Sequence, residues 1–172
     1  MSAIKFENAV VASILEEAIE FCARKTGLKE REKVLEAISK GDCSVCEYLR
    51  YALAKGIARY LGSMDDTVKA VYVYEPEYAT SMDVAIPGRP NFSPGINMIA
   101  RVSRKSAALS SVVASLNSAL AEECKQLACP KANALCYGLD VEMADDDEVV
   151  RRTGYGALIS SLSVHPMEVW QR

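Results

Sequence analysis

The spacing of apolar residues changes near residue 66, and this change limits the folds open to the chain. Before it, apolar residues recur every three or four positions in three stretches that end close to Gly27, Gly41 and Gly62. This is the spacing of core-facing helices. Ser44 and Glu47 fit a capping box at the start of the third stretch. Short glycine-ended turns between three such helices predict a small bundle.

After residue 66 the apolar residues alternate with polar ones or form short β-branched runs. Residues 68–74, 96–102 and 135–143 are therefore predicted strands. Ser106 is placed to cap a long helix between the last two of them. Past residue 145, we expect a short helical turn over 148–152 and an edge strand in the tail after Pro166. Residues 157–163 fit either a strand or a helix, and we favour a strand.

Helices followed by strands argue for an α+β fold rather than a doubly wound sheet. We expect an N-terminal three-helix bundle over residues 1–64. Residues 65–172 would then hold a mostly antiparallel sheet of three to five strands, covered by one long helix. The two parts either pack together as one domain or form two, and the sequence leaves the choice and the strand order open.

The charge balance narrows the classes of partner. With 20 Lys and Arg against 23 Asp and Glu, the net charge is -3, which argues against sequence-independent nucleic-acid binding. We find neither a secretory leader nor an apolar run long enough for a membrane span. The sequence therefore predicts a cytoplasmic protein without a nucleic-acid or membrane partner. In that compartment the six cysteines are expected as thiols rather than structural disulfides.

Cys43 and Cys46 form a C-x-x-C pair at the predicted start of the third helix, where the helix dipole favours a thiolate. The pair resembles that of the all-helical carboxymuconolactone decarboxylase and peroxidase-reductase group over about fifteen residues. That group has a histidine soon after the second cysteine, and residues 47–50 here contain none. Thioredoxin-like proteins place such a pair after a strand, whereas here a helix precedes it. The pair indicates a thiol-dependent redox site or an ordinary packed thiol.

Three other features could carry chemistry: a group of cysteines, a pair of carboxylates and the single histidine. Cys124, Cys129 and Cys136 lie within thirteen residues, but not in the paired spacing of a zinc ribbon, and we expect no metal site. Asp140 and Glu142 point to the same side of a predicted strand, as a carboxylate pair or a solvated face. His165, the single histidine, is expected to be exposed or capping.

The Pro- and Gly-rich segment 85–95 is long enough for a binding loop or for a plain hairpin connection. Arg89, Asn91 and Phe92 would lie near its tip. Arg101 and Arg104 lie where a predicted strand meets a helix start, which could hold an anion or carry ordinary surface charge. We take these five as the candidate binding residues.

These observations favour a small-molecule or protein binding module with its site at the loop 85–95 and the sheet. The alternative is a thiol-dependent redox enzyme that uses Cys43 and Cys46. The sequence does not decide whether there is catalysis, and it identifies no cofactor. The tyrosines in and just after the first predicted strand leave a homo-oligomer open.

Overall fold

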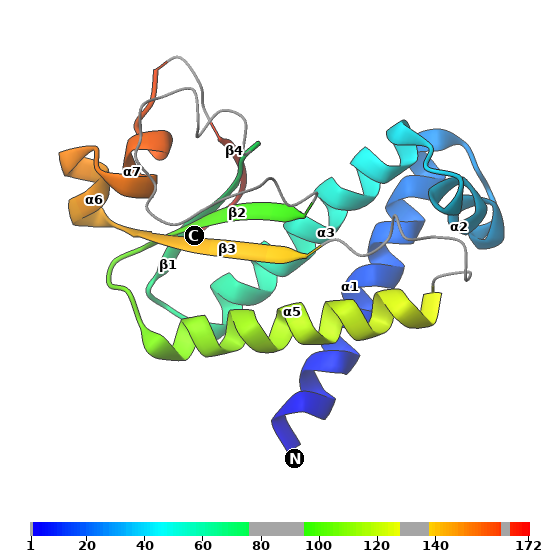
Figure 1. The fold of residues 1–172 in the computed structure, drawn as a ribbon, viewed down its shortest axis with the longest axis horizontal. Helices are drawn as coiled ribbons and strands as arrows, with labels where there is room; N and C mark the ends of the chain where they lie inside the picture. The colour runs from blue at the N-terminus through cyan, green and yellow to red at the C-terminus, as the bar shows by residue number, and fades with distance from the viewer. Residues whose placement is uncertain (1, 76–94, 128–137, 163–165) are drawn as a thin grey trace. The chain divides into compact units, whose positions relative to one another are not determined.

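The computed structural model describes residues 2–75, 95–127, 138–162 and 166–172, which form an α+β fold (Figure 1). These residues hold six helices and a four-stranded sheet. The elements in chain order are α1 (Ser2–Thr26), α2 (Arg31–Ser39), α3 (Cys43–Met64), β1 (Val68–Val73), β2 (Ile96–Val102), α5 (Ala107–Leu127), β3 (Leu139–Asp145), α6 (Asp146–Arg151), α7 (Gly154–Ile159) and β4 (Met167–Gln171).

The N-terminal helical part is confirmed. Gly27 and Gly41 follow α1 and α2 with φ angles of +75° and +74°, a left-handed conformation that glycine adopts without steric cost. The predicted Ser44–Glu47 capping box is wrong, because Asp42 caps α3 instead. Its Oδ1 accepts hydrogen bonds from the backbone N–H groups of Ser44 (3.1 Å) and Val45 (3.2 Å). The packing of the three helices as a bundle stays a prediction.

Gly62 does not end α3, as the sequence suggested, because the helix continues to Met64. A Cβ atom at residue 62 would lie 2.2 Å from Cζ2 of Trp170, a distance that packed atoms do not reach. The glycine therefore allows the helix backbone to approach the indole ring of β4 closely.

The strands β1, β2 and β4 fall where the sequence predicts them, and the order across the sheet is β3-β2-β1-β4. The tail strand β4 lies at an edge, as expected. β1 pairs antiparallel with both β2 and β4, whereas β2 and β3 pair in parallel. The sheet is thus mixed, and the expectation of a mostly antiparallel sheet is wrong. Residues 135–137 of the predicted third strand lie outside the described residues.

The parallel pair follows from the element between its strands. α5 has 21 residues, and a helix returns the chain toward the start of the strand it leaves, as in every βαβ crossover. The hydroxyl of Ser106 accepts a hydrogen bond from the N–H of Leu109 at 3.0 Å, so the predicted cap is confirmed.

The predicted strand over 157–163 is wrong, because residues 154–159 form the helix α7. It packs on the short helix α6, which a capping box of Asp145 and Glu148 begins. Gly156 makes this packing close: a Cβ there would lie 2.3 Å from the carbonyl carbon of Glu148. Leu158, one of the apolar residues that suggested a strand, is buried in a small core as part of this helix.

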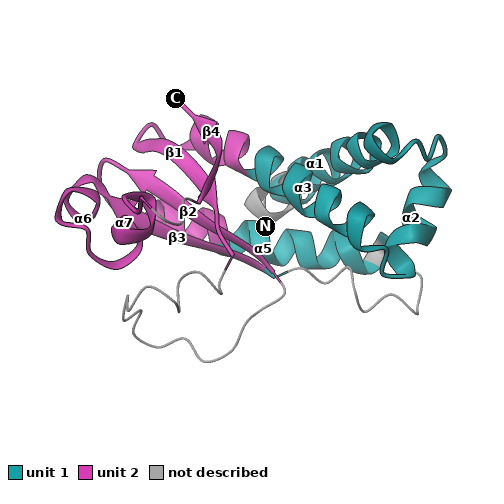
Figure 2. Cartoon of the chain, turned by 90° about the horizontal axis from the view of Figure 1, so that it is seen from above, with its two compact units in different colours: residues 1–57, 114–138 teal, residues 58–113, 139–172 magenta. Residues whose placement is uncertain are grey.

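The chain groups into two compact units (Figure 2). Residues 1–57 and 114–138 make up the first, and residues 58–113 and 139–172 the second. α3 and α5 each contribute residues to both units. We call them the helical unit and the sheet unit. The predicted division at residues 64 and 65 stays a prediction.

We predict that Gly156→Ala destabilises the protein far more than Gly154→Ala. At position 154 the φ of +49° strains an L-residue, but the nearest atom lies 3.7 Å away, and the expected cost is about 1 kcal/mol. At position 156 the new methyl group meets the backbone of α6, and about 3 kcal/mol is expected. Urea unfolding of the two variants measures the difference. Equal costs would contradict the close packing of α6 and α7.

Candidate functional site

Side chains of β2 and β3 bring four polar groups to one side of the sheet. Asn97 lies opposite Asp140, and Ile99 lies opposite Glu142 in the parallel register. Because alternate residues of a strand share a face, Arg101 lies on this side too. We call Asn97, Arg101, Asp140 and Glu142 the polar sheet face. The prediction that Asp140 and Glu142 share one side of a strand is confirmed, and both are half-buried.

Asn97 is the most unusual member of the polar sheet face. Only 4% of it is exposed, and its Nδ2 donates a hydrogen bond to the carbonyl of Gly95 at 3.2 Å. Among the described residues its Oδ1 has no hydrogen-bond partner. A buried acceptor left without a donor costs about 1–3 kcal/mol. Sequence reasoning missed Asn97, although a polar amide within a largely apolar strand was a visible signal.

The middle of the same face is apolar. Tyr74, Ile99, Ala144 and Leu158 form a buried cluster with Tyr155 of α7 packed against it. The ring centroids of Tyr74 and Tyr155 lie 6.0 Å apart, within the range of attractive aromatic pairs. The helices α6 and α7 therefore pack on the centre of this face, and Asn97 lies two residues from that centre along β2.

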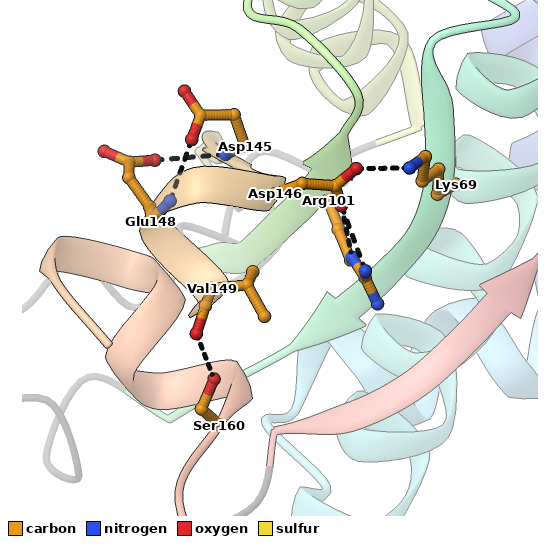
Figure 3. A network of polar contacts seen from close by, with 7 residues as sticks. All are labelled: Lys69, Arg101, Asp145, Asp146, Glu148, Val149 and Ser160. Carbon is orange, nitrogen blue, oxygen red and sulfur yellow. Dashed lines mark hydrogen bonds and ion pairs between the residues drawn. The ribbon is translucent and has the colours of Figure 1, made fainter. Parts of the chain in front are cut away.

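Asp146, the first residue of α6, is held by cations from two strands (Figure 3). Lys69 of β1 donates to its Oδ2, and the Nε and Nη2 atoms of Arg101 each lie 3.0 Å from its Oδ1. The hydrogen bond from Lys69, and then that from Arg101, lower the pKa of the Asp146 carboxyl. The guanidinium of Arg101, a member of the polar sheet face, is thus engaged within the protein.

Two further contacts hold α6 in place. Lys105 binds Glu148 at 2.7 Å, and the Ser160 hydroxyl donates to the carbonyl of Val149 at 2.9 Å (Figure 3). Arg104, the other predicted anion-binding residue, is exposed. Its positive charge helps to lower the pKa of Asp65, for which the hydrogen bonds from Thr67 are the larger cause.

The remaining predicted site residues divide into described and undescribed ones. Arg89, Asn91, Phe92, Cys129, Cys136 and His165 lie outside the described residues. Within the described part of the chain, no three His, Cys, Asp or Glu side chains are grouped so that they could hold a metal ion. No helix described here is long and apolar enough to cross a membrane.

The C-x-x-C pair lies at the start of α3, as predicted, and a third thiol lies behind it. Cys43 is exposed and Cys46 is half-buried. Cys22 of α1 is fully buried, with its Sγ 3.7 Å from the carbonyl oxygen of Val45. Burial, and next the charge of Cys46, raise the pKa of the Cys22 thiol to about 11. Sequence reasoning counted Cys22 as core only, because its place beside α3 depends on tertiary packing.

The helical unit also has a pocket of about 330 Å³ between α1 and α5. Its lining is Glu7, Asn8, Ala114, Ser115, Ser118, Ala119 and Glu122. Glu7 Oε2 is buried and has no hydrogen-bond partner within the described residues. The pocket therefore carries negative charge without a basic lining residue.

Comparison with known proteins gives no assignment: no family model fits the sequence, and no curated protein or solved structure matches it.

We predict that Asp146→Asn lowers the free energy of unfolding by about 1 kcal/mol at pH 7, the upper end for a partly exposed ion pair. Because the pKa of Asp146 is below its ordinary 3.8, its contribution is complete above that value. It is lost as the pH falls through the lowered pKa. Urea unfolding at pH 7 and at a series of lower pH values measures the effect, which should shrink as the pH falls below 3.8.

Asp147→Asn is the matched control for this prediction. Asp147 shares the first turn of α6, but its side chain is 85% exposed and its nearest cation, Arg151, lies 4.0 Å away. Losses of equal size in both variants would show that the helix dipole, not the contacts with Lys69 and Arg101, accounts for the effect.

Proposed function

We propose that this protein is a binding module whose ligand is a small organic cation with N–H donors, bound at the polar sheet face beside the segment 85–95. The supporting observation is the buried Oδ1 of Asn97, which has no donor among the described residues. Its Nδ2 is already used by Gly95, so the group that remains available is an acceptor. An acceptor selects a ligand that donates.

The charges of the neighbouring residues favour a ligand that is positively charged. Asp140 lies opposite Asn97 in the register, and Glu142 lies on the same face. Both carry carboxylates, which take part in other interactions within the chain and which form stronger hydrogen bonds with cationic donors than with neutral ones. The nearby cation Arg101 is paired with Asp146, so its charge is largely compensated. An amine or guanidine compound fits these groups better than an anion does.

The other parts of the sequence-based hypothesis stay predictions. Arg89, Asn91 and Phe92 are retained as predicted contacts of the segment 85–95, and the homo-oligomer and the cytoplasmic location are retained as well. A protein partner could offer the same chemistry through a lysine or arginine side chain, but we favour a small molecule because Asn97 is deeply buried.

We predict that agmatine, which has both an ammonium and a guanidinium group, raises the melting temperature of the full-length protein. A ligand at one hundred times its Kd stabilises the folded state by about 2.7 kcal/mol, a shift of several degrees in a thermal scan. Asn97→Leu should abolish the shift because the acceptor is lost. Asn97→Asp, which keeps an acceptor at the same place, should retain it.

Three outcomes would contradict this proposal. One is the absence of any shift with agmatine, and another is a shift that survives in Asn97→Leu. If that surviving shift is lost in the Glu7→Gln and Glu122→Gln variants, the cation binds in the α1–α5 pocket instead. The third is a shift with pyrophosphate that Arg101→Gln removes, which would make the ligand an anion.

A further inference from the structure

Three cysteines of the helical unit lie at three different depths. Cys43 is the first residue of α3 and is exposed, and Cys46 lies one turn later and is half-buried. Cys22, from α1, is fully buried behind them. Its Sγ faces the carbonyl of Val45 at 3.7 Å, in the same turn of α3. Of these three thiols, Cys43 is the one that is open to reagents, and Cys22 is closed off from them.

The thiols differ in their ability to react. Cys22, whose pKa is raised to about 11, remains protonated near neutral pH, and only thiolates attack disulfides. Cys43 is accessible, and among its described contacts its Sγ makes only a long one, 3.9 Å to the carbonyl of Gly41. The attacking group is thus Cys43, and Cys46 is the nearest partner along the helix.

Two exposed carboxylates lie close to Cys43 along the chain. Asp42 is adjacent and exposed, and the hydrogen bonds from Ser44 and Val45 lower the pKa of its carboxyl. Glu47 follows one turn later and is also exposed. The nearest lysine along the chain, Lys40, is paired with Glu36 at 2.6 Å. A cationic reagent is therefore attracted to this surface, and an anionic one is repelled.

We propose that Cys43 and Cys46 form a thiol–disulfide exchange site that prefers cationic small-molecule disulfides. Cys43 is the attacking thiol and Cys46 the resolving thiol, while Cys22 stays reduced. This site is independent of the ligand proposed for the polar sheet face, because it uses residues of the helical unit only.

The exchange proceeds in two balanced steps. The Cys43 thiolate attacks one sulfur of the small-molecule disulfide, whose S–S bond breaks as the mixed disulfide forms, and the released thiolate takes a proton from water. The Cys46 thiolate then attacks Cys43 Sγ and displaces the second half as a thiol. The two cysteines lose two electrons and two protons in total, and the small-molecule disulfide is reduced to two thiols.

Ring closure requires a small movement of the first turn of α3. Residues three apart on a helix have Cβ atoms about 5–6 Å apart, whereas a disulfide needs about 3.5–4.5 Å. Helix ends fray readily, and residues 42–44 are exposed. The first turn can therefore supply this movement without disturbing the buried side of α3.

We predict that cystamine oxidises the reduced full-length protein to a Cys43–Cys46 disulfide, which peptide mapping under non-reducing conditions identifies. Cys46→Ser should accumulate the mixed disulfide on Cys43, because the resolving thiol is lost. Cys43→Ser should slow the reaction at this site at least tenfold. Cys22→Ala should leave the reaction unchanged. A first adduct on another cysteine, or an unaltered rate in Cys43→Ser, would overturn the assignment.

The charge preference has its own test. Rates with cystamine, neutral hydroxyethyl disulfide and oxidised glutathione are divided by the rates that a free model thiol gives with each reagent. The ratio should be highest for cystamine and lowest for oxidised glutathione. Asp42→Asn keeps a good helix cap but removes the charge, and it should reduce the cystamine-to-glutathione preference by about fivefold. An equal preference in both proteins would overturn the electrostatic part of the proposal.

Discussion

The sheet unit depends on β2, the one strand of the sheet with a buried residue at nearly every position. It pairs with β1 on one side and β3 on the other, so both of its edges form backbone hydrogen bonds with a neighbouring strand. All but one of its side chains are buried, and the exception, Arg101, binds Asp146. The burial of apolar side chains is the dominant favourable term in folding. The flanking elements are therefore placed where they keep the side chains of β2 from water.

The helices α6 and α7 cover only part of one face of β2, and this partial cover creates the candidate site. On the side of Ile99, α7 supplies Leu158 and Tyr155 to a small core, and Val149 of α6 packs against it. Lys69 and Arg101 fix the start of α6 through Asp146. A helix as short as α6 has little intrinsic stability, so its cap and these ion pairs determine where it begins. Its position in turn leaves Asn97 beyond the small core.

The sequence predicted features that depend on local chemistry. Gly27 and Gly41 end helices because their left-handed backbone needs no distant partner, and Ser106 caps α5 by bonding a residue three positions ahead. The strands β1 and β2 were visible because their β-branched and alternating residues already favour extended backbone.

The features that the sequence did not predict depend on distant residues. A mostly antiparallel sheet was expected, but the helical connection through α5 makes the pairing of β3 with β2 parallel. Leu158 and Ile159 have the composition of a strand, yet Gly156 lets them pack as a helix on α6. At the candidate sites, no local pattern indicated that Lys69 would reach Asp146 or that Cys22 would lie beside α3.

The proposed function gives a reason for a buried amide at position 97. An apolar side chain of similar shape at this position would extend the cluster around Ile99 and would gain transfer free energy, about 1.5–3 kcal/mol for a fully buried aliphatic group. The amide instead gains one hydrogen bond to Gly95 and buries an acceptor without a donor among the described residues. Residues that break a local rule of folding at a net cost are expected where function requires them. A ligand that donates to Oδ1 would remove that cost on binding, so part of its affinity would come from satisfying an acceptor that the protein has already desolvated.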